Sequence, residues 1–266
     1  MTDTPDGLPT LVLRDISKAF GAVQALDSVD FDVDSGEVMA LVGDNGAGKS
    51  TLIKCLAGIY PIDSGQVLFD GNPVTIHGPR DAGRLGIEIV YQDLALCDNL
   101  DVVQNMYLGR ELIDRVGRVR DTEMERVAAQ TLSGLRVTTI RSIRQKVASL
   151  SGGQRQSVAV ARAVMWNSRV VILDEPTAAL GVAQTRQVLD LVRRLADQGL
   201  AVVIVSHNLH DIFEVADRIT VLRLGQNAAV FRRSETTQQE VVQSITSGVA
   251  TKVPGIAETA GSAHGD

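Results

Sequence analysis

Nine consecutive residues have the composition and spacing of a phosphate-binding loop. In chain order they are Gly43, Asp44, Asn45, Gly46, Ala47, Gly48, Lys49, Ser50 and Thr51. They satisfy the pattern G-x-x-x-x-G-K-[ST], in which glycines let backbone N–H groups surround phosphate oxygens and a following helix adds the positive end of its dipole. We expect Lys49 to reach the β- and γ-phosphates and the Ser50 hydroxyl to ligate Mg²⁺. A glycine-rich turn is the alternative, but every position is filled, so the run predicts a nucleoside triphosphate site.

Two adjacent carboxylates follow an apolar run farther along the chain. Residues 170–173 are Val-Val-Ile-Leu, and Asp174 and Glu175 come directly after them. In phosphate-loop enzymes the first acid after such a strand helps to hold Mg²⁺, which assigns that role to Asp174. Glu175 should point to the other side of the strand end, where a hydrolytic water could sit. A structural ion-pair acid is the alternative for Glu175.

Two further polar residues follow apolar runs. Gln92 comes after the run at 87–90, and His207 comes after the run at 201–205. Ligands of open α/β sheets collect at the carboxyl ends of the strands, so both residues are predicted to converge with the phosphate loop. Taken alone, a histidine in such a place is more often a hydrogen-bonded cap than a catalytic group.

A second potential anion site follows Leu150. It consists of Ser151, Gly152, Gly153 and Gln154, and an amphipathic helix follows. Ser151 can cap that helix, and the two glycines expose N–H groups at its N-terminus. Its distance along the chain from the other motifs raises the possibility that it serves the nucleotide of another chain. An ordinary serine-capped helix start is the alternative.

The elements that must position these residues alternate between strand and helix. Apolar runs at 37–42, 87–90, 170–173, 201–205 and 218–222 predict buried strands of a largely parallel sheet. Alternating patterns at 10–17 and 29–33 predict antiparallel edge strands. A helix is expected from Lys49 to about Gly58. The fold class predicted is therefore α/β, a phosphate-loop core with a mixed, mostly parallel sheet and an antiparallel β edge.

Residues 95–165 have a different pattern. Helical periodicity occurs at 101–108, 122–133 and 152–166, without a convincing strand, which predicts a helical subdomain inserted into the sheet domain. The last 18 residues, 249–266, are rich in Gly, Ala, Thr and Ser, and we expect a disordered tail there.

Composition excludes several classes of protein. With 26 basic and 32 acidic side chains the net charge is −6, which disfavours a nucleic-acid partner. Two cysteines cannot form a disulfide framework and suit a reducing compartment. No apolar run reaches the roughly 18–20 residues that span a bilayer, and the acidic N-terminus does not read as a signal peptide.

In this order, the motifs resemble those of the ATP-binding cassette (ABC) proteins. The resemblance rests on Leu150–Gln154 (LSGGQ) lying between the phosphate loop and VVILDEP at 170–176, and it covers about residues 8–245. It implies a cassette over 8–248, ATP and Mg²⁺ as cofactors, and ATP hydrolysis. It also implies that the helical subdomain at about 95–165 is the signature subdomain of the family.

The resemblance implies a role for each candidate residue. Phe20 corresponds to the aromatic residue that stacks on adenine, with a core aromatic as the alternative. Gln92 corresponds to the residue that senses Mg²⁺ and the γ-phosphate and links to the membrane partner. Glu175 corresponds to the general base, and His207 to the residue that contacts the γ-phosphate and orients Glu175 and water.

Three longer segments narrow the resemblance to one group within the family. The segments 41–71, 104–111 and 206–223 are most similar to ATPase subunits of bacterial importers for ribose, xylose, fructose and similar monosaccharides. Two features depart from that group, which usually carries two cassettes in one chain. This chain has one cassette, and Ala178-Ala179-Leu180-Gly181 lacks the Asp that many cassettes have at the end of this loop.

A single cassette implies partners. We expect a second copy of the chain in a head-to-tail dimer, in which Ser151–Gln154 of one copy completes the ATP site of the other. Integral membrane permease subunits and, indirectly, a periplasmic sugar-binding protein are also implied, with this chain peripheral at the cytoplasmic face of the inner membrane. The alternatives are an ABC transporter ATPase for amino acids, lipids or drugs, and a non-transport ABC ATPase of translation or DNA repair.

Overall fold

The computed structural model describes residues 9–248. Its centre is a six-stranded sheet in the order β10-β9-β3-β8-β7-β6. Five strands run parallel and β10 is antiparallel to β9. The strands are β3 (Val38–Val42), β6 (Ile87–Val90), β7 (Val170–Asp174), β8 (Ala201–Val205), β9 (Arg218–Arg223) and β10 (Gln226–Arg232). The predicted mostly parallel sheet is therefore confirmed.

A second sheet of four antiparallel strands has the order β2-β1-β4-β5. Its strands are β1 (Leu11–Phe20), β2 (Val23–Val33), β4 (Ser64–Phe69) and β5 (Asn72–Val74). The antiparallel edge was predicted, but the segment at 29–33 is only the second half of β2. Register shifts between β1 and β2 interrupt the alternation of side chains, which hides the first half of β2 in the sequence pattern.

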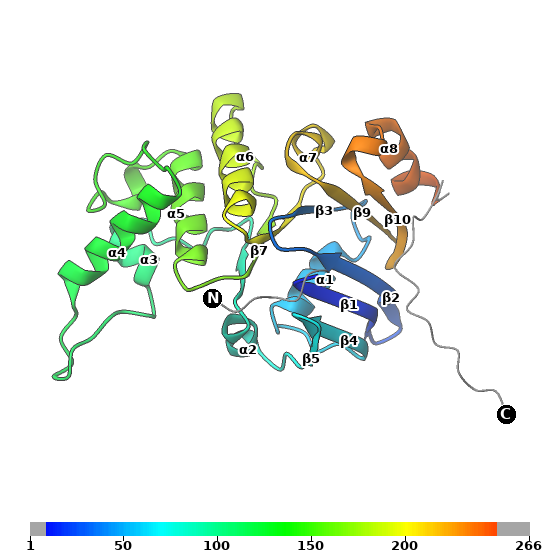
Figure 1. The fold of residues 1–266 in the computed structure, drawn as a ribbon, viewed down its shortest axis with the longest axis horizontal. Helices are drawn as coiled ribbons and strands as arrows, with labels where there is room; N and C mark the ends of the chain where they lie inside the picture. The colour runs from blue at the N-terminus through cyan, green and yellow to red at the C-terminus, as the bar shows by residue number, and fades with distance from the viewer. Residues whose placement is uncertain (1–8, 249–266) are drawn as a thin grey trace.

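In the described part of the chain, eight α-helices pack around the two sheets (Figure 1). They are α1 (Lys49–Leu56), α2 (Pro79–Arg84), α3 (Val102–Tyr107), α4 (Asp121–Gly134), α5 (Gly152–Val164), α6 (Val182–Asp197), α7 (Leu209–Val215) and α8 (Gln238–Ser247). Between β6 and β7 the chain forms α3, α4 and α5 and, in the described residues, no regular strand. No helix among residues 9–248 combines the length and apolar character that crossing a bilayer requires. The tail predicted at 249–266 lies outside the described residues.

The core lies on both faces of β3, as its uninterrupted apolar sequence requires. All five residues of β3 are buried. Val38, Ala40 and Val42 pack in a cluster with side chains of α5, α6 and α7. Met39 and Leu41 pack on the other face with α1 and the four-stranded sheet. The strand that leads into the phosphate loop is therefore fixed from both sides.

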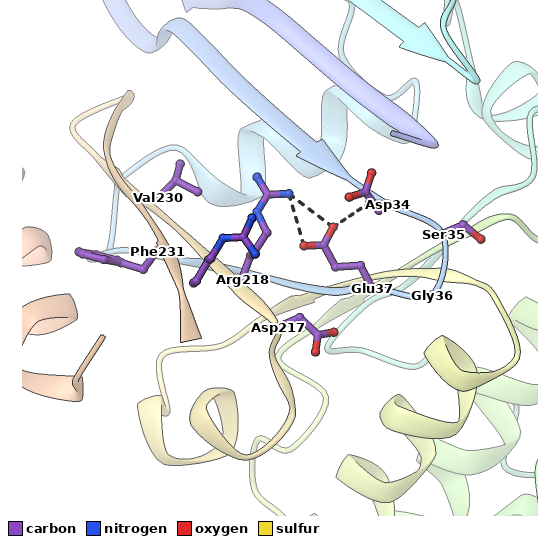
Figure 2. A pocket seen from close by; sticks show the side chains of 9 residues that line it. Asp34, Ser35, Gly36, Glu37, Asp217, Arg218, Val230 and Phe231 are labelled. Carbon is purple, nitrogen blue, oxygen red and sulfur yellow. Dashed lines mark hydrogen bonds and ion pairs between the residues drawn. The ribbon is translucent and has the colours of Figure 1, made fainter. Parts of the chain in front are cut away.

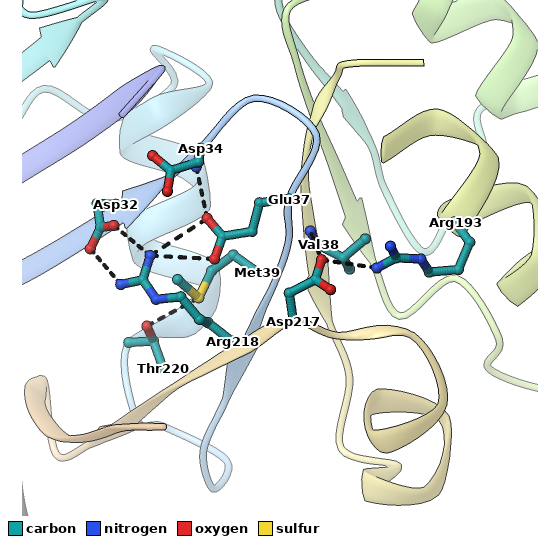
Figure 3. Close-up of polar contacts among 9 residues, drawn as sticks. All are labelled: Asp32, Asp34, Glu37, Val38, Met39, Arg193, Asp217, Arg218 and Thr220. Carbon is teal, nitrogen blue, oxygen red and sulfur yellow. Dashed lines mark hydrogen bonds and ion pairs between the residues drawn. The ribbon is translucent and has the colours of Figure 1, made fainter. Parts of the chain in front are cut away.

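Arg218 joins the two sheets at the edge opposite the phosphate loop (Figure 3). Its guanidinium donates two hydrogen bonds to the carboxylate of Asp32 in β2, at 2.7 and 3.0 Å. It also contacts Glu37, just before β3, at 3.3 Å. Glu37 accepts a further hydrogen bond from the amide of Asp34 at 2.8 Å. Arg218 thereby connects β2, β3 and β9 through side chains alone.

Asp34, Glu37 and Arg218 of this network line a cavity of about 490 Å³ (Figure 2). Glu37 is only 8% exposed there, and burial raises the pKa of its carboxyl to about 7 despite the attraction of Arg218. When the pKa of a carboxyl is higher in the folded chain than in the unfolded chain, ionising that carboxyl lowers the free energy of unfolding. Its contribution is present below the unfolded pKa and is lost as the pH rises through about 7.

We predict that Glu37→Gln removes this pH dependence. Between pH 5 and pH 8, the free energy of unfolding of the variant should rise relative to wild type, on the order of 2–3 kcal/mol. Urea unfolding without nucleotide at the two pH values measures the difference. Glu235→Gln, at an exposed carboxylate, is the matched control. A difference between variant and wild type that stays constant from pH 5 to pH 8 would contradict the assignment.

Candidate functional site

The candidate residues lie at one edge of the six-stranded sheet. In the register, Leu41 of β3 and Asp174 of β7 both pair with Val205 of β8. Val90 of β6 pairs with Leu173, one residue before Asp174. The chain segments that leave these strands carry the phosphate loop, Glu175, His207 and Gln92, so the structure places all four at the same edge.

Two glycines of the phosphate loop are required by close packing. Gly43 has φ 151°, and a Cβ there would lie 2.3 Å from the carbonyl oxygen of Leu222 in β9. Gly48, the residue before α1, has φ 103°, and its Cβ would lie 2.8 Å from the carbonyl oxygen of Ala25. Gly46 also has a positive φ, 81°, but faces open space. The loop is therefore held against β2 and β9 by contacts that no other residue type permits.

Lys49 folds back over this loop. Its Nζ donates to the carbonyl oxygens of Gly43, at 2.7 Å, and Asp44, at 3.0 Å. Burial lowers the pKa of Lys49, while the nearby carboxylates of Glu175, Asp44 and Asp174 act in the opposite direction. The ammonium therefore lies between the loop and the acidic end of β7, where it can meet a phosphate.

Asp174 has the properties expected of a cation ligand. Burial, and then the charge of Glu175, raise the pKa of its carboxyl. Within residues 9–248 its side chain makes no hydrogen bond or ion pair. The described residues also contain no group of three His, Cys, Asp or Glu side chains that could hold a metal alone. The Asp174 carboxylate is therefore an oxygen donor of the kind that Mg²⁺ prefers, and Ser50 and Gln92 are the other residues predicted from the sequence to ligate the ion.

Glu175 and His207 contact each other. The Nδ1 atom of His207 lies 2.9 Å from Oε1 of Glu175, and the imidazole is 75% exposed. Glu175 has φ 50°, unusual for a residue with a side chain, and its amide donates to the carbonyl oxygen of Val205 at 2.8 Å. This strained turn aims the Glu175 carboxylate at the histidine that follows the neighbouring strand.

The turn after Glu175 depends on residues that the sequence patterns did not single out. The Thr177 hydroxyl donates to Asp211 at 2.6 Å, and both side chains are buried. Ser206 is fully buried, and its Oγ accepts from the amide of Asn208 at 3.0 Å. These hydrogen bonds fix the segments before and after His207. An Asp in the first turn of a helix has no distinctive local pattern that shows it to be buried, so only the fold reveals its contact with Thr177.

Ser151 and Gln154 cap α5 reciprocally. The Ser151 side chain accepts from the amide of Gln154, and the Gln154 side chain accepts from the amide of Ser151 at 2.9 Å. A Cβ on Gly152 would lie 2.7 Å from Leu180, and one on Gly153 would lie 3.2 Å from Gln184. The glycines therefore let α5 approach the start of α6, in addition to leaving N–H groups uncovered.

The start of α5 is separate from the phosphate loop. In Figure 1, α5 and α1 lie on opposite sides of β7. Among the described residues, no hydrogen bond joins Ser151–Gln154 to Gly43–Thr51. One copy of the chain therefore does not bring the two predicted anion sites together.

Phe20 is 43% exposed, which rules out the core alternative for this residue. Its ring packs edge-on against Tyr60, with centroids 5.0 Å apart, and Nζ of Lys18 lies 5.5 Å from its centroid. Lys18 is itself fixed by Asp63, 2.7 Å away. Tyr60 follows α1, so the aromatic pair lies beside the helix that the phosphate loop opens. The sequence patterns did not indicate Tyr60.

A phosphate loop at the carboxyl edge of a mostly parallel sheet defines a phosphate-loop nucleotide-binding protein. The family model described as "ABC transporter" matches residues 26–178. A xylose/arabinose import ATP-binding protein of Sulfolobus acidocaldarius is 46% identical over 91% of this chain and 96% of its own length. The chain belongs to the ABC transporter family.

Other relatives and solved structures agree on the fold. A fructose import ATP-binding protein of Rhizobium meliloti is 46% identical, covering 90% of this chain and 94% of its own. A ribose import ATP-binding protein of Yersinia pestis is 42% identical over 89% of this chain, which spans only 46% of that protein. A nucleotide-free cassette of an ABC transporter superposes with TM-score 0.77 at 27% identity, over 89% of this chain and 98% of that one. Single-cassette relatives therefore exist beside the longer ribose type.

Proposed function

We propose that the chain is the ATP-hydrolysing subunit that energises import of a monosaccharide through a separate membrane permease. The observation that carries the ATPase part is the arrangement at one sheet edge. There the phosphate loop, Asp174 and the contacting pair Glu175 and His207 lie together. The monosaccharide part rests on the import ATP-binding proteins that the chain resembles over nine-tenths of its length.

In this proposal the phosphate loop and Lys49 bind the β- and γ-phosphates of ATP. Ser50, Asp174 and Gln92 would hold Mg²⁺, which neutralises charge on the phosphates when bound. Lys49 would exchange its bonds to the loop carbonyls for phosphate oxygens. The exposed face of Phe20 would stack on adenine, with Tyr60 behind it. Lys49 thus offers hydrogen bonds that a phosphate can replace, and Phe20 offers an exposed ring beside α1.

Glu175 would act as general base. A water that attacks the γ-phosphorus gives up a proton to the carboxylate as the bond to the β-phosphate oxygen breaks. Glu175 has no other hydrogen-bonded partner than His207 for its carboxylate among the described residues. His207, through its 2.9 Å contact, would orient the carboxylate and reach the γ-phosphate with the exposed side of its ring.

We predict that Glu175→Gln retains ATP binding and lowers the hydrolysis rate by about 10²–10⁴, the usual size of a general-base contribution. The amide keeps the shape and the contact with His207 but cannot accept the proton. Nucleotide affinity by fluorescence titration and phosphate release separate the two effects. Glu214→Gln, at an exposed carboxylate of α7, is the control. A turnover rate close to wild type in the Glu175 variant would refute the role.

The second anion site, Ser151–Gln154, would complete the ATP site of another copy. Its separation from the phosphate loop within one chain supports this arrangement. A post-hydrolysis cassette structure described as dimeric and bound to ADP and phosphate superposes with TM-score 0.69 at 25% identity, over 84% of this chain and 98% of that one. Two-fold symmetry would then give two equivalent sites. ATP would favour the closed dimer, and loss of the γ-phosphate would reopen it.

We predict complementation between two variants that are each inactive alone. Lys49→Ala removes the phosphate contact, and Ser151→Arg blocks the capped start of α5 with a bulky cation. A mixed dimer holds one site with both defects and one intact site, so mixing should restore part of the ATPase activity. Phosphate release from equimolar mixtures measures it. If mixed dimers form, as shown by crosslinking, but stay inactive, the shared site is wrong.

The cargo assignment has its own test. We place the chain at the cytoplasmic face of the inner membrane, bound to the permease. When the permease and a periplasmic binding protein are present, xylose, fructose or ribose should stimulate the ATPase activity several-fold. The measurement is phosphate release from the reconstituted complex as each sugar is added. Stimulation by an amino acid, with none by a monosaccharide, would favour a transporter for other cargo and leave the ATPase assignment intact.

A further inference from the structure

The chain between α3 and α4 forms a short hairpin, residues 112–120, which we call the 112–120 hairpin. Ile113 and Val119 form an isolated antiparallel bridge in it. The amide of Asp114 donates to the carbonyl oxygen of Arg118 at 2.8 Å, and Gly117 closes the turn with φ 82°. In Figure 1 this segment extends beyond α3 and α4 at the periphery of the molecule.

The turn of the hairpin is fixed by one carboxylate. Oδ1 of Asp114 accepts from the amides of Val116 and Arg118, each at 2.9 Å. The amide of Gly117 donates to the carbonyl oxygen of Asp114 at 3.1 Å. Aspartate at the first position of a tight turn and glycine at the left-handed position are the residues that such a hairpin favours. The hairpin is therefore a shaped projection whose tip backbone is largely hydrogen-bonded.

Three apolar side chains of the 112–120 hairpin face solvent. Ile113 is 63% exposed, Val116 is 74% exposed and Val119 is 48% exposed. Leu112, at the base, packs instead against the main core cluster. The hairpin is thus anchored at its base and presents an aliphatic tip, an arrangement that the folding of this chain does not require.

The charges of the hairpin are mostly positive. Arg115, Arg118 and Arg120 stand against the single carboxylate of Asp114 within residues 112–120. Arg120 pairs with Glu123 at 2.5 Å. Arg115 and Arg118 are exposed, and within residues 9–248 their side chains make no ion pair or hydrogen bond. A chain of net charge −6 therefore places two unpaired cations beside three exposed aliphatic side chains.

We propose that the 112–120 hairpin contacts an anionic lipid surface. Aliphatic side chains at the tip enter the headgroup region while long arginine side chains keep their charges among the lipid phosphates. The paired backbone of the tip lets it approach the membrane without exposing many unsatisfied N–H and C=O groups. Charge complementarity favours this occupant, because the unpaired cations Arg115 and Arg118 of the described residues match the anionic lipid phosphates.

The contact is weak because only a few side chains take part in it. Each arginine near an anionic leaflet changes affinity by about fivefold, and the three aliphatic side chains add a partial burial. Such a contact binds the chain to the membrane weakly and reversibly, and stable attachment needs a second point of attachment. It involves neither the phosphate loop nor Glu175, so it is independent of the ATPase assignment.

Flotation of the whole purified chain with lipid vesicles, without nucleotide, tests the proposal. We expect binding to vesicles of equimolar phosphatidylglycerol and phosphatidylcholine, weaker binding at high salt, and none to phosphatidylcholine alone. The double variant Arg115→Gln/Arg118→Gln should lower the partition coefficient about tenfold to thirtyfold. Val116→Asp should lower it comparably, because a charge at the tip opposes insertion.

Matched variants elsewhere on the surface separate the hairpin from general charge effects. Arg14→Gln/Arg80→Gln removes two other exposed arginines, and Val242→Asp places a charge at an exposed valine of α8. Both should bind vesicles like wild type, and thermal unfolding should show all four variants folded. Equal losses in hairpin and control variants, or no binding of wild type to anionic vesicles, would overturn the proposal. If the hairpin variants instead lose only co-purification with the permease, the partner is a protein.

Discussion

The close approach of Gly43 to the carbonyl oxygen of Leu222 determines where the phosphate loop leaves the sheet. Because the space for a Cβ is taken by the backbone of β9, only glycine fits at the point where the loop leaves β3. The β9–β10 turn adds a second restraint, since the amide of Gly225 donates to the carbonyl oxygen of Ala47 at 3.1 Å. These two contacts hold the loop that leads to Lys49 and α1 against β9 and the turn that follows it.

Much of the fold was predictable because its signals are local. The buried strands are continuous apolar runs, and the phosphate loop and the pair of acids at 174–175 are contiguous in sequence. The strands β4, β5 and β10 were missed, since they are short or half-exposed and alternate poorly. The contact of Phe20 with Tyr60 and that of Thr177 with Asp211 join residues far apart in sequence, so no local pattern announces them.

The two ends of the six-stranded sheet use charge differently. At the carboxyl end, Asp174 and Lys49 are partly buried near other charged groups. Burial raises the pKa of Asp174 and lowers the pKa of Lys49. At the opposite end, Arg218 satisfies Asp32 and Glu37 from within the chain. The first end has charged groups with shifted pKa values, which suits it to binding a charged ligand. At the second end the charges pair within the chain and hold the two sheets together.

The approach of Gly152 and Gly153 to Leu180 and Gln184 connects two regions that share no ligand within one chain. Leu180 lies five residues after Glu175, on the segment that leaves the turn there, while the two glycines are the first residues of α5. A side chain at either glycine would meet Leu180 or Gln184, so the two segments pack directly on each other. One copy of the chain therefore joins the turn that carries Glu175 to the start of α5 by direct packing, so the two surfaces are parts of one continuous piece of the molecule.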